Sequence, residues 1–182
     1  MKKRTLALIL ALVLVFGAAV GGTIAYLTDT TGPITNTFTV GNINIGLAET
    51  ATDFKMVPGC DITKDPKVTV EANSEACWLF VRIDESSNLD DFISYTVASD
   101  WTQGDGTKIP ANVWYRSVDA STTDQIFSVL AGDKVTVNTS VTKTMMDGLE
   151  VTGATQPTLT FTAYACQSAN MSVEAAWAEV NK

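Results

Sequence analysis

The chain has 182 residues, of which 46% are hydrophobic and 18% are charged, and its formal net charge is -8. The length suits a single domain, and the hydrophobic content excludes an intrinsically disordered chain. The sequence contains no histidine, which excludes a Ser-His-Asp triad, a Cys-His pair and a zinc centre with imidazole ligands. We therefore expect a protein that is not an enzyme, with no catalytic, metal-binding or cofactor-binding residues.

The N-terminal segment has the pattern of an export signal. Residues 2–4 are basic, residues 5–28 carry no charge, and small residues follow the apolar stretch. A basic start, an apolar middle and a small-residue exit are typical of a secretory signal peptide. We predict a signal-peptide helix over residues 1–26 and a single all-β domain over residues 27–182.

Two neighbouring bonds fit the cleavage pattern, Ala25–Tyr26 and Tyr26–Leu27. The alternative to cleavage is a membrane anchor, because about 20 apolar residues can span a bilayer. Cleavage removes three of the 12 basic residues and none of the 20 acidic ones, so the mature chain has a net charge of -11. This charge argues against nucleic acid and anionic lipid as partners. We expect a secreted protein of the cell surface or extracellular matrix, which meets the membrane only through an uncleaved leader.

The remaining sequence alternates with a period of two. Ile34, Phe38 and Val40 alternate with threonines in residues 34–40, as in a half-buried strand. Turn chemistry at Gly104-Asp105-Gly106, Gly132-Asp133 and Asp147-Gly148 separates further strands. These strands are predicted over residues 43–47, 66–70, 76–83, 92–97, 113–118, 126–130, 134–141 and 158–166.

The strand predicted at residues 76–83 is apolar on both faces, which suits a central strand covered on each side. One face carries Cys77, Leu79, Val81 and Ile83, and the other carries Trp78, Phe80 and Arg82.

Only the C-terminus looks helical. Ser172 is a suitable N-cap, and Val173, Ala176, Trp177 and Val180 share one face. So short a helix must dock on the strands to be stable. Eight or nine short strands without interleaved helices predict a β-sandwich of the jelly-roll or Greek-key type, with a short C-terminal helix.

Three cysteines are present, Cys60, Cys77 and Cys166, none with Cys-x-x-Cys spacing. Cys77 and Cys166 are candidates for a disulfide in an exported chain, because both lie in predicted strands. The alternative is three buried thiols that behave as small apolar residues.

Acidic residues flank two predicted loops. We interpret them as a solvated rim that protects sheet edges, with a weak extracellular calcium site as the alternative. They are Asp84, Glu85, Asp90 and Asp91 around the first loop, and Asp119 and Asp124 around the second.

Aromatic residues raise the alternative of a carbohydrate- or host-binding adhesin, because jelly rolls often serve as lectins. Trp78 and Trp177 lie on apolar stripes and are better interpreted as core. The positions of Trp101, Trp114 and Tyr115 stay open. An adhesin would require Trp101 or Trp114 to stand in an exposed groove.

Several blocks of the sequence, in order, resemble a known family. Residues 21–29 (GGTIAYLTD) resemble the export signals cleaved by the SipW-type signal peptidase of Gram-positive bacteria. Five further blocks resemble the TasA and camelysin family. They are residues 38–45 (FTVGNINI), 64–70 (KDPKVTV), 75–81 (EACWLFV) and 163–167 (AYACQ), and Ala176-Trp177.

The resemblance implies a jelly-roll subunit that is released by a SipW-type peptidase and assembles with itself into biofilm matrix fibres. In such fibres the freed N-terminal strand of one subunit completes a sheet of its neighbour. On this sequence the donor falls within residues 27–38, with Ile34 and Phe38 in the assembly strand. Camelysins have been classed as metalloendopeptidases, so a surface metalloendopeptidase is the alternative function. The sequence departs from that chemistry because it offers no histidine ligand.

Overall fold

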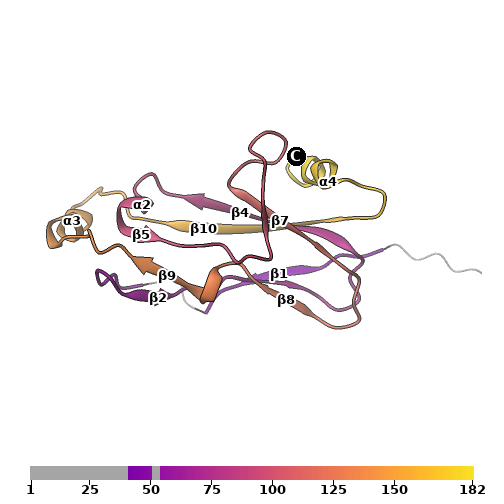
Figure 1. The fold of residues 1–182 in the computed structure, drawn as a ribbon, viewed down its shortest axis with the longest axis horizontal. Coiled ribbons are helices and arrows are strands. Elements are labelled where there is room, and N and C mark those ends of the chain that lie inside the picture. Colours follow the sequence, from indigo (N-terminus) through magenta and orange to yellow (C-terminus); the bar gives the residue numbers. More distant parts are fainter. Residues whose placement is uncertain (1–40, 51–53) are drawn as a thin grey trace, which may run out of the picture. The chain divides into compact units, whose positions relative to one another are not determined.

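The computed structural model describes residues 41–50 and 54–182, which belong to one compact unit, Val40–Lys182. These residues form ten strands, three α-helices and one 3-10 helix (Figure 1). In chain order they are β1 (Ile45–Ala48), β2 (Asp61–Thr63), β3 (Lys67–Val70), β4 (Cys77–Glu85), α2 (Leu89–Phe92), β5 (Ile93–Ser94), β6 (Thr102–Gln103), β7 (Val113–Val118), β8 (Gln125–Ser128), η1 (Ala131–Asp133), β9 (Lys134–Val137), α3 (Lys143–Leu149), β10 (Leu159–Gln167) and α4 (Val173–Val180).

The strands form three antiparallel sheets. The four-stranded sheet has the order β10-β4-β7-β6. The two others have three strands each, and we call them the β3 sheet (β1-β3-β8) and the β9 sheet (β2-β9-β5). The fold is therefore mostly β with antiparallel pairing, as the period-two pattern predicts.

The β3 and β9 sheets continue into each other. Hydrogen bonds from Lys64 N to Asp133 O (2.9 Å) and from Val129 N to Pro66 O (2.9 Å) join the β2–β9 pair to the β3–β8 pair. The segment between β8 and β9 (residues 129–133) is two residues longer than the segment between β2 and β3 (residues 64–66) that lies opposite it. The extra residues form η1, where Gly132 has a φ of 68°. The turn predicted at Gly132-Asp133 is thus a bulge within one ladder.

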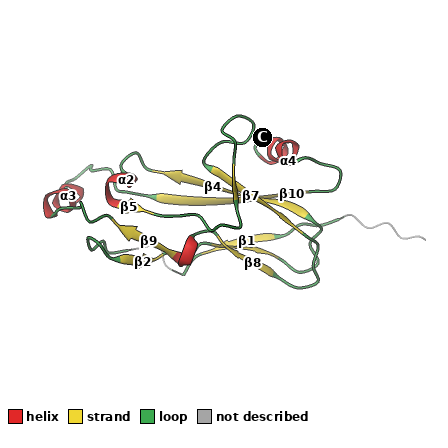
Figure 2. Ribbon diagram, in the orientation of Figure 1, coloured by secondary structure: helices red, strands yellow, loops and turns green. Residues whose placement is uncertain are grey.

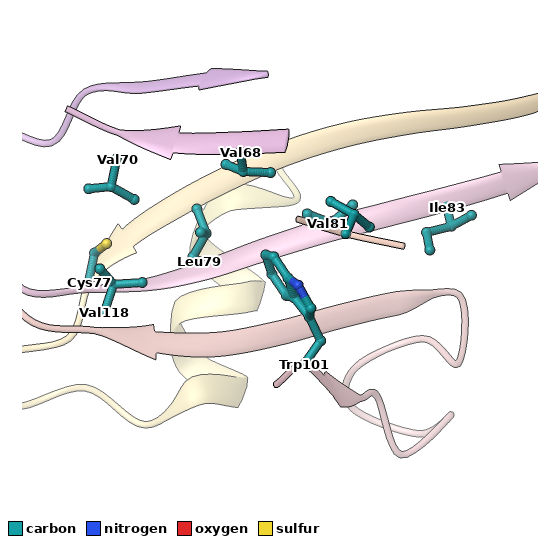
Figure 3. Close-up of a cluster of buried hydrophobic side chains, with 9 residues drawn as sticks. Val68, Val70, Cys77, Leu79, Val81, Ile83, Trp101 and Val118 are labelled. Atoms are coloured by element: carbon teal, nitrogen blue, oxygen red, sulfur yellow. The ribbon is translucent and has the colours of Figure 1, made fainter. Parts of the chain in front are cut away.

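The main core lies between two layers. The four-stranded sheet forms one layer, and the β3 sheet forms part of the other (Figure 1). Their facing side chains interdigitate along β4, as Figure 3 shows. This core consists of Val68, Val70, Cys77, Leu79, Val81, Ile83, Trp101, Val118 and Val129, all at most 4% exposed.

The outer face of β4 is covered by α4, which lies over the four-stranded sheet (Figure 2). Phe80, from the second apolar face of β4, is fully buried against Trp177 of α4, with ring centroids 5.4 Å apart. The Ser172 hydroxyl caps the helix by accepting a hydrogen bond from Ala175 N (3.3 Å). Both predictions are confirmed: β4 is buried on its two faces, and the C-terminal helix docks on the strands.

A third cluster lies at the β9 sheet. Val135 and Val137 of β9 pack with Leu89 and Phe92 of α2. Met145, Met146 and Leu149 of α3 pack against the same cluster. The short helices therefore close one end of the molecule, at the opposite end from α4 (Figure 2).

Most predicted strands are present with small shifts in their bounds, and β7 agrees residue for residue. The prediction that only the C-terminus is helical is wrong, because α2 and α3 also form. Asp147-Gly148 lies inside α3 rather than in a turn. There the Thr142 hydroxyl caps the helix by accepting from Met145 N (3.3 Å), and this local bond outweighs the turn preference of Asp-Gly. The signal peptide and the strand predicted at residues 34–40 lie outside the described residues.

Candidate assembly site

The edge strand β10 leaves one long side of the four-stranded sheet open. Its nine residues pair with β4 along their whole length. It is the end strand of that sheet, with no second partner among the described strands. The unpaired N–H and C=O groups of an edge strand are a template for another strand. β10 therefore provides the longest open edge in this sheet.

Two hollows lie along this edge, where β10 faces β1 and β2. Their volumes are about 450 Å³ and 290 Å³, and both are lined by Leu159 and Thr160 of β10. We call them together the β10 groove. An apolar floor with a few polar groups is typical of a binding surface. The floor of the larger hollow is formed by Phe54, Met56, Ile62, Leu89, Ile93 and Val135.

A buried ion pair stands between the two hollows. Lys64 lines the larger hollow and Glu49 the smaller one, and their charged atoms are 2.7 Å apart. The two side chains are only 10% and 16% exposed. The Lys64 ammonium also lies 5.0 Å from the ring centroid of Phe54 and 5.4 Å from that of Phe161. Because each charge satisfies the other, the pair divides the groove without leaving an uncompensated buried charge.

Sequence reasoning missed Lys64, although the signal was present. Ile62, Lys64, Pro66, Val68 and Val70 alternate with more exposed neighbours, so Lys64 lies on the inward face of this segment. The predicted strand began at residue 66 because Pro66 marks a strand start. If the alternation is extended back from Pro66 to Ile62, Lys64 falls on the inward face, which predicts a buried ammonium group.

The described chain begins at the end of the molecule where β4 begins and β10 ends. Glu75 N donates to Asn42 O (2.9 Å), and Ser168 N donates to Ala76 O (3.0 Å). The larger hollow lies beside Leu159, at the other end of β10. The predicted assembly residues Ile34 and Phe38, and the cleavage residues Ala25, Tyr26 and Leu27, lie outside the described residues.

The cysteines are unpaired in the structure, with Cys60 exposed and Cys77 and Cys166 buried. Cys166 is opposite Trp78 in the β4–β10 register, one position from Cys77. The two side chains lie on opposite faces of the sheet, because Cys77 belongs to the main core and Cys166 to the cluster under α4. A bond between them would require one sulfur to cross the plane of the sheet, and the disulfide stays a prediction.

We expect Cys60 to be the reactive thiol of the native mature protein. Burial raises the pKa of the Cys77 thiol to about 11, with a smaller contribution from Cys166, and burial also raises the pKa of Cys166. Maleimide labelling of Cys77 and Cys166 should be at least about a hundredfold slower than that of Cys60, because the thiolate is the nucleophile. Peptide mass spectrometry over time measures this, with Cys60→Ser as the control. Equal labelling rates at all three cysteines would contradict the buried positions of Cys77 and Cys166. A count of one reactive thiol per chain in denaturant would establish a disulfide between the other two.

All four tryptophans are buried or half-buried in the clusters. Trp177 is in the cluster under α4, and Trp78 packs against it, as predicted. Trp101 is 4% exposed in the main core, and its indole N–H donates to Ser128 O (2.9 Å). Trp101 therefore does not stand in an exposed groove. Tyr115 packs against the cluster under α4. Trp114 of β7 lies between Val81 of β4 and Gln103 of β6, where it is half-buried against the main core.

The side chains of three of the six acidic residues of the loops have hydrogen-bond or ion-pair partners. Asp84 forms an ion pair with Arg82 (2.8 Å), and the Asp124 carboxylate accepts from Ala72 N (2.8 Å). Glu85 accepts a hydrogen bond from the Tyr95 hydroxyl. Within residues 41–50 and 54–182, no group of three or more Asp, Glu or Cys side chains is arranged to hold a metal ion.

No helix of the part of the chain that the structure describes is long and apolar enough to span a bilayer. No family model, curated protein or solved structure matches the chain. The functional argument therefore depends on the residues and geometry of this chain.

Proposed function

We propose that this protein is a secreted structural subunit of a biofilm matrix fibre or cell-surface layer, a jelly-roll subunit of the TasA and camelysin kind. It assembles when a SipW-type peptidase frees its N-terminal strand, residues 27–38, which docks in the β10 groove of a second copy. The observation that carries this proposal is the open nine-residue edge of β10 beside a groove that is lined by both apolar and polar side chains.

The dimensions of the donor suit this edge. An extended segment rises about 3.3 Å per residue, so nine residues of β10 span roughly 30 Å. The 12 residues of the donor segment are long enough to pair along the whole strand. Ile34 and Phe38 are four residues apart, and side chains with even spacing lie on one face of a strand. The donor thus offers two apolar side chains to an apolar groove.

The chain direction favours exchange between copies. A segment that folded back from Gly41 onto β10 of its own subunit would run parallel to β10. Every strand pair of the described part is antiparallel, and antiparallel pairing is slightly more stable per residue. A segment from a second copy can approach in the antiparallel direction, so assembly gives the better pairing.

Thr160→Arg tests the acceptor. Thr160 is exposed and lines both hollows, so an arginine there should obstruct the β10 groove while leaving the folded subunit within about 0.5 kcal/mol of its normal stability. We expect the critical concentration for fibre formation by the mature chain to rise at least about tenfold, which corresponds to 1.4 kcal/mol of contact energy. Sedimentation and negative-stain microscopy measure it.

Thr102→Arg is the matched control. Thr102 is also an exposed strand threonine, but it lies in β6 at the opposite edge of the same sheet. Fibres should form normally with this variant. Normal assembly of Thr160→Arg would refute the β10 groove as the acceptor, and a selective effect of Thr102→Arg would move the acceptor to the β6 edge.

A further inference from the structure

A second hollowed surface lies where β6, the start of β7 and the end of β4 face the segment of β5. Two open hollows of about 440 Å³ each meet there. Both are lined by Glu85, Tyr95 and Trp114. We call this surface the Trp114 hollow. It shares no lining residue with the larger hollow of the β10 groove except Ile93.

Its aromatic side chains are placed to bind rather than only to pack. Trp114 is half-buried, and its indole N–H has no acceptor among the described residues. The indole N–H groups of Trp78 and Trp101, in contrast, donate to the carbonyl oxygens of Met171 and Ser128. A tryptophan with a partly exposed ring and a free N–H offers a flat apolar surface and a donor to the same ligand.

Planar polar groups surround the ring. Gln103 Nε2 donates to Ala111 O (2.8 Å), and Asn112 Nδ2 donates to Asp84 Oδ1 (3.1 Å). These bonds fix both amides, and their carbonyl oxygens have no donor among the described residues. The Tyr95 hydroxyl holds one oxygen of Glu85, and the other oxygen has no donor there. Fixed acceptors beside a ring face are suited to the hydroxyl groups and the apolar C–H face of a sugar.

The charge of the surface restricts the ligand further. Glu85 and Asp90 line the hollows, and neither hollow is lined by a lysine or arginine. Asp84 also lines one of them, but its charge is compensated by the ion pair with Arg82. Anionic ligands such as phosphate polymers or uronic acids would be repelled. Hydroxyl and ammonium groups would both find carboxylate acceptors.

We propose that the Trp114 hollow binds a glycan whose pyranose rings carry hydroxyl or amino groups and no anionic group. Trp114 stacks against a sugar ring, and Gln103, Asn112 and Glu85 accept hydrogen bonds from its substituents. The two surfaces share only Ile93 among their lining residues, and they adjoin across the β4–β10 pair, where Asp84 and Glu85 of the hollow are opposite Thr160 and Leu159 of the groove. The glycan proposal does not rest on the proposed assembly.

Isothermal titration of the mature chain tests this binding. The probes are the hexamers of N-acetylglucosamine, glucosamine and galacturonic acid. We expect saturable binding of at least one of the first two, and binding of galacturonic acid at least tenfold weaker than the best of them. Trp114→Ala should weaken binding roughly fivefold or more, because stacking on an aromatic ring contributes on the order of 1 kcal/mol.

Trp114 also packs against the main core, so a second variant is needed that leaves the core intact. Gln103→Ala removes an exposed amide of the hollow, and Gln167→Ala, an exposed glutamine of β10, is its matched control. Gln103→Ala should weaken binding severalfold, and Gln167→Ala should leave it unchanged. Absence of saturable binding to both amino-sugar hexamers, unchanged binding by Trp114→Ala and Gln103→Ala, or a preference for galacturonic acid would each overturn the proposal.

Discussion

Deletion of residues 27–37 from the mature chain is expected to give a folded monomer that forms no fibres at concentrations where the intact mature chain does. The described fold begins at Gly41 and contains all three clusters, so the deletion removes none of the packing seen there. It does remove Ile34 and the polar residues that would pair with β10. The monomer should therefore keep its unfolding midpoint and lose its tendency to polymerise.

The expected magnitude follows from the apolar side chains of the donor. Full burial of an isoleucine or a phenylalanine contributes about 1.5–3 kcal/mol each. Together they would stabilise each contact by roughly 3–6 kcal/mol before the cost of ordering the strand. Loss of even half of this energy raises the critical concentration about tenfold or more. Size-exclusion chromatography with light scattering, followed by microscopy, measures the loss.

Point variants separate the donor surface from chain length. Ile34→Asp with Phe38→Asp should abolish fibres, because both side chains lie on the face proposed to enter the groove. Thr35→Asp with Thr37→Asp adds the same charge on the other face and should assemble far better. The synthetic peptide of residues 27–38 should bind to the deleted chain. Unchanged fibres after the deletion, or equal effects of the two double variants, would end the donor-strand proposal.

The sequence predicts well those elements in which local pattern and tertiary environment agree. Residues 77–83 alternate between two apolar sets, and the structure buries one set under the β3 sheet and places the other at α4. The C-terminal helix is predictable for the same reason, since its cap and its apolar face both favour it. In these segments, tertiary packing reinforces the local preference.

Other features depend on contacts between distant segments. α3 has only seven residues, and an isolated helix of this length is unstable. It forms because Met145, Met146 and Leu149 pack against a cluster that includes Leu89 and Phe92, more than 50 positions away in the sequence. The Lys64–Glu49 pair likewise requires the approach of β10, whose Phe161 ring covers the ammonium group. No local pattern in the sequence brings these groups together.

The candidate site shows the same division. An acceptor edge could not be predicted from the sequence, because whether β10 or another strand lies at the end of a sheet depends on strand order. The sequence could show which tryptophans lie on apolar stripes, and Trp78 and Trp177 follow that prediction. It could not separate Trp101 from Trp114, because neither is assigned to an apolar stripe. The fold buries the first and leaves the second half-buried in β7.

Trp177→Ala is expected to destabilise the mature chain by about 3–5 kcal/mol, the cost of removing a large aromatic side chain from a core. Trp177 is 3% exposed, and its ring lies 5.4 Å from that of Phe80 and 5.6 Å from that of Tyr164, edge to face. The eight residues of α4 cannot hold a helix without this contact. Removal of the ring should therefore release the helix and expose the outer face of β4.

Urea unfolding followed by circular dichroism measures this loss, because the signal does not depend on the tryptophan that is removed. Glu179→Ala is the control: Glu179 is an exposed residue of the same helix, paired only with Lys182 near the chain end, and its loss should change the unfolding free energy by less than about 0.5 kcal/mol. A loss below about 1 kcal/mol for Trp177→Ala would show that α4 does not depend on this ring. If Trp177→Ala loses much of its stability but still forms fibres under conditions in which it stays folded, α4 stabilises the subunit and takes no part in assembly. That separation is expected, because α4 covers the outer face of the sheet while the β10 groove opens toward β1 and β2.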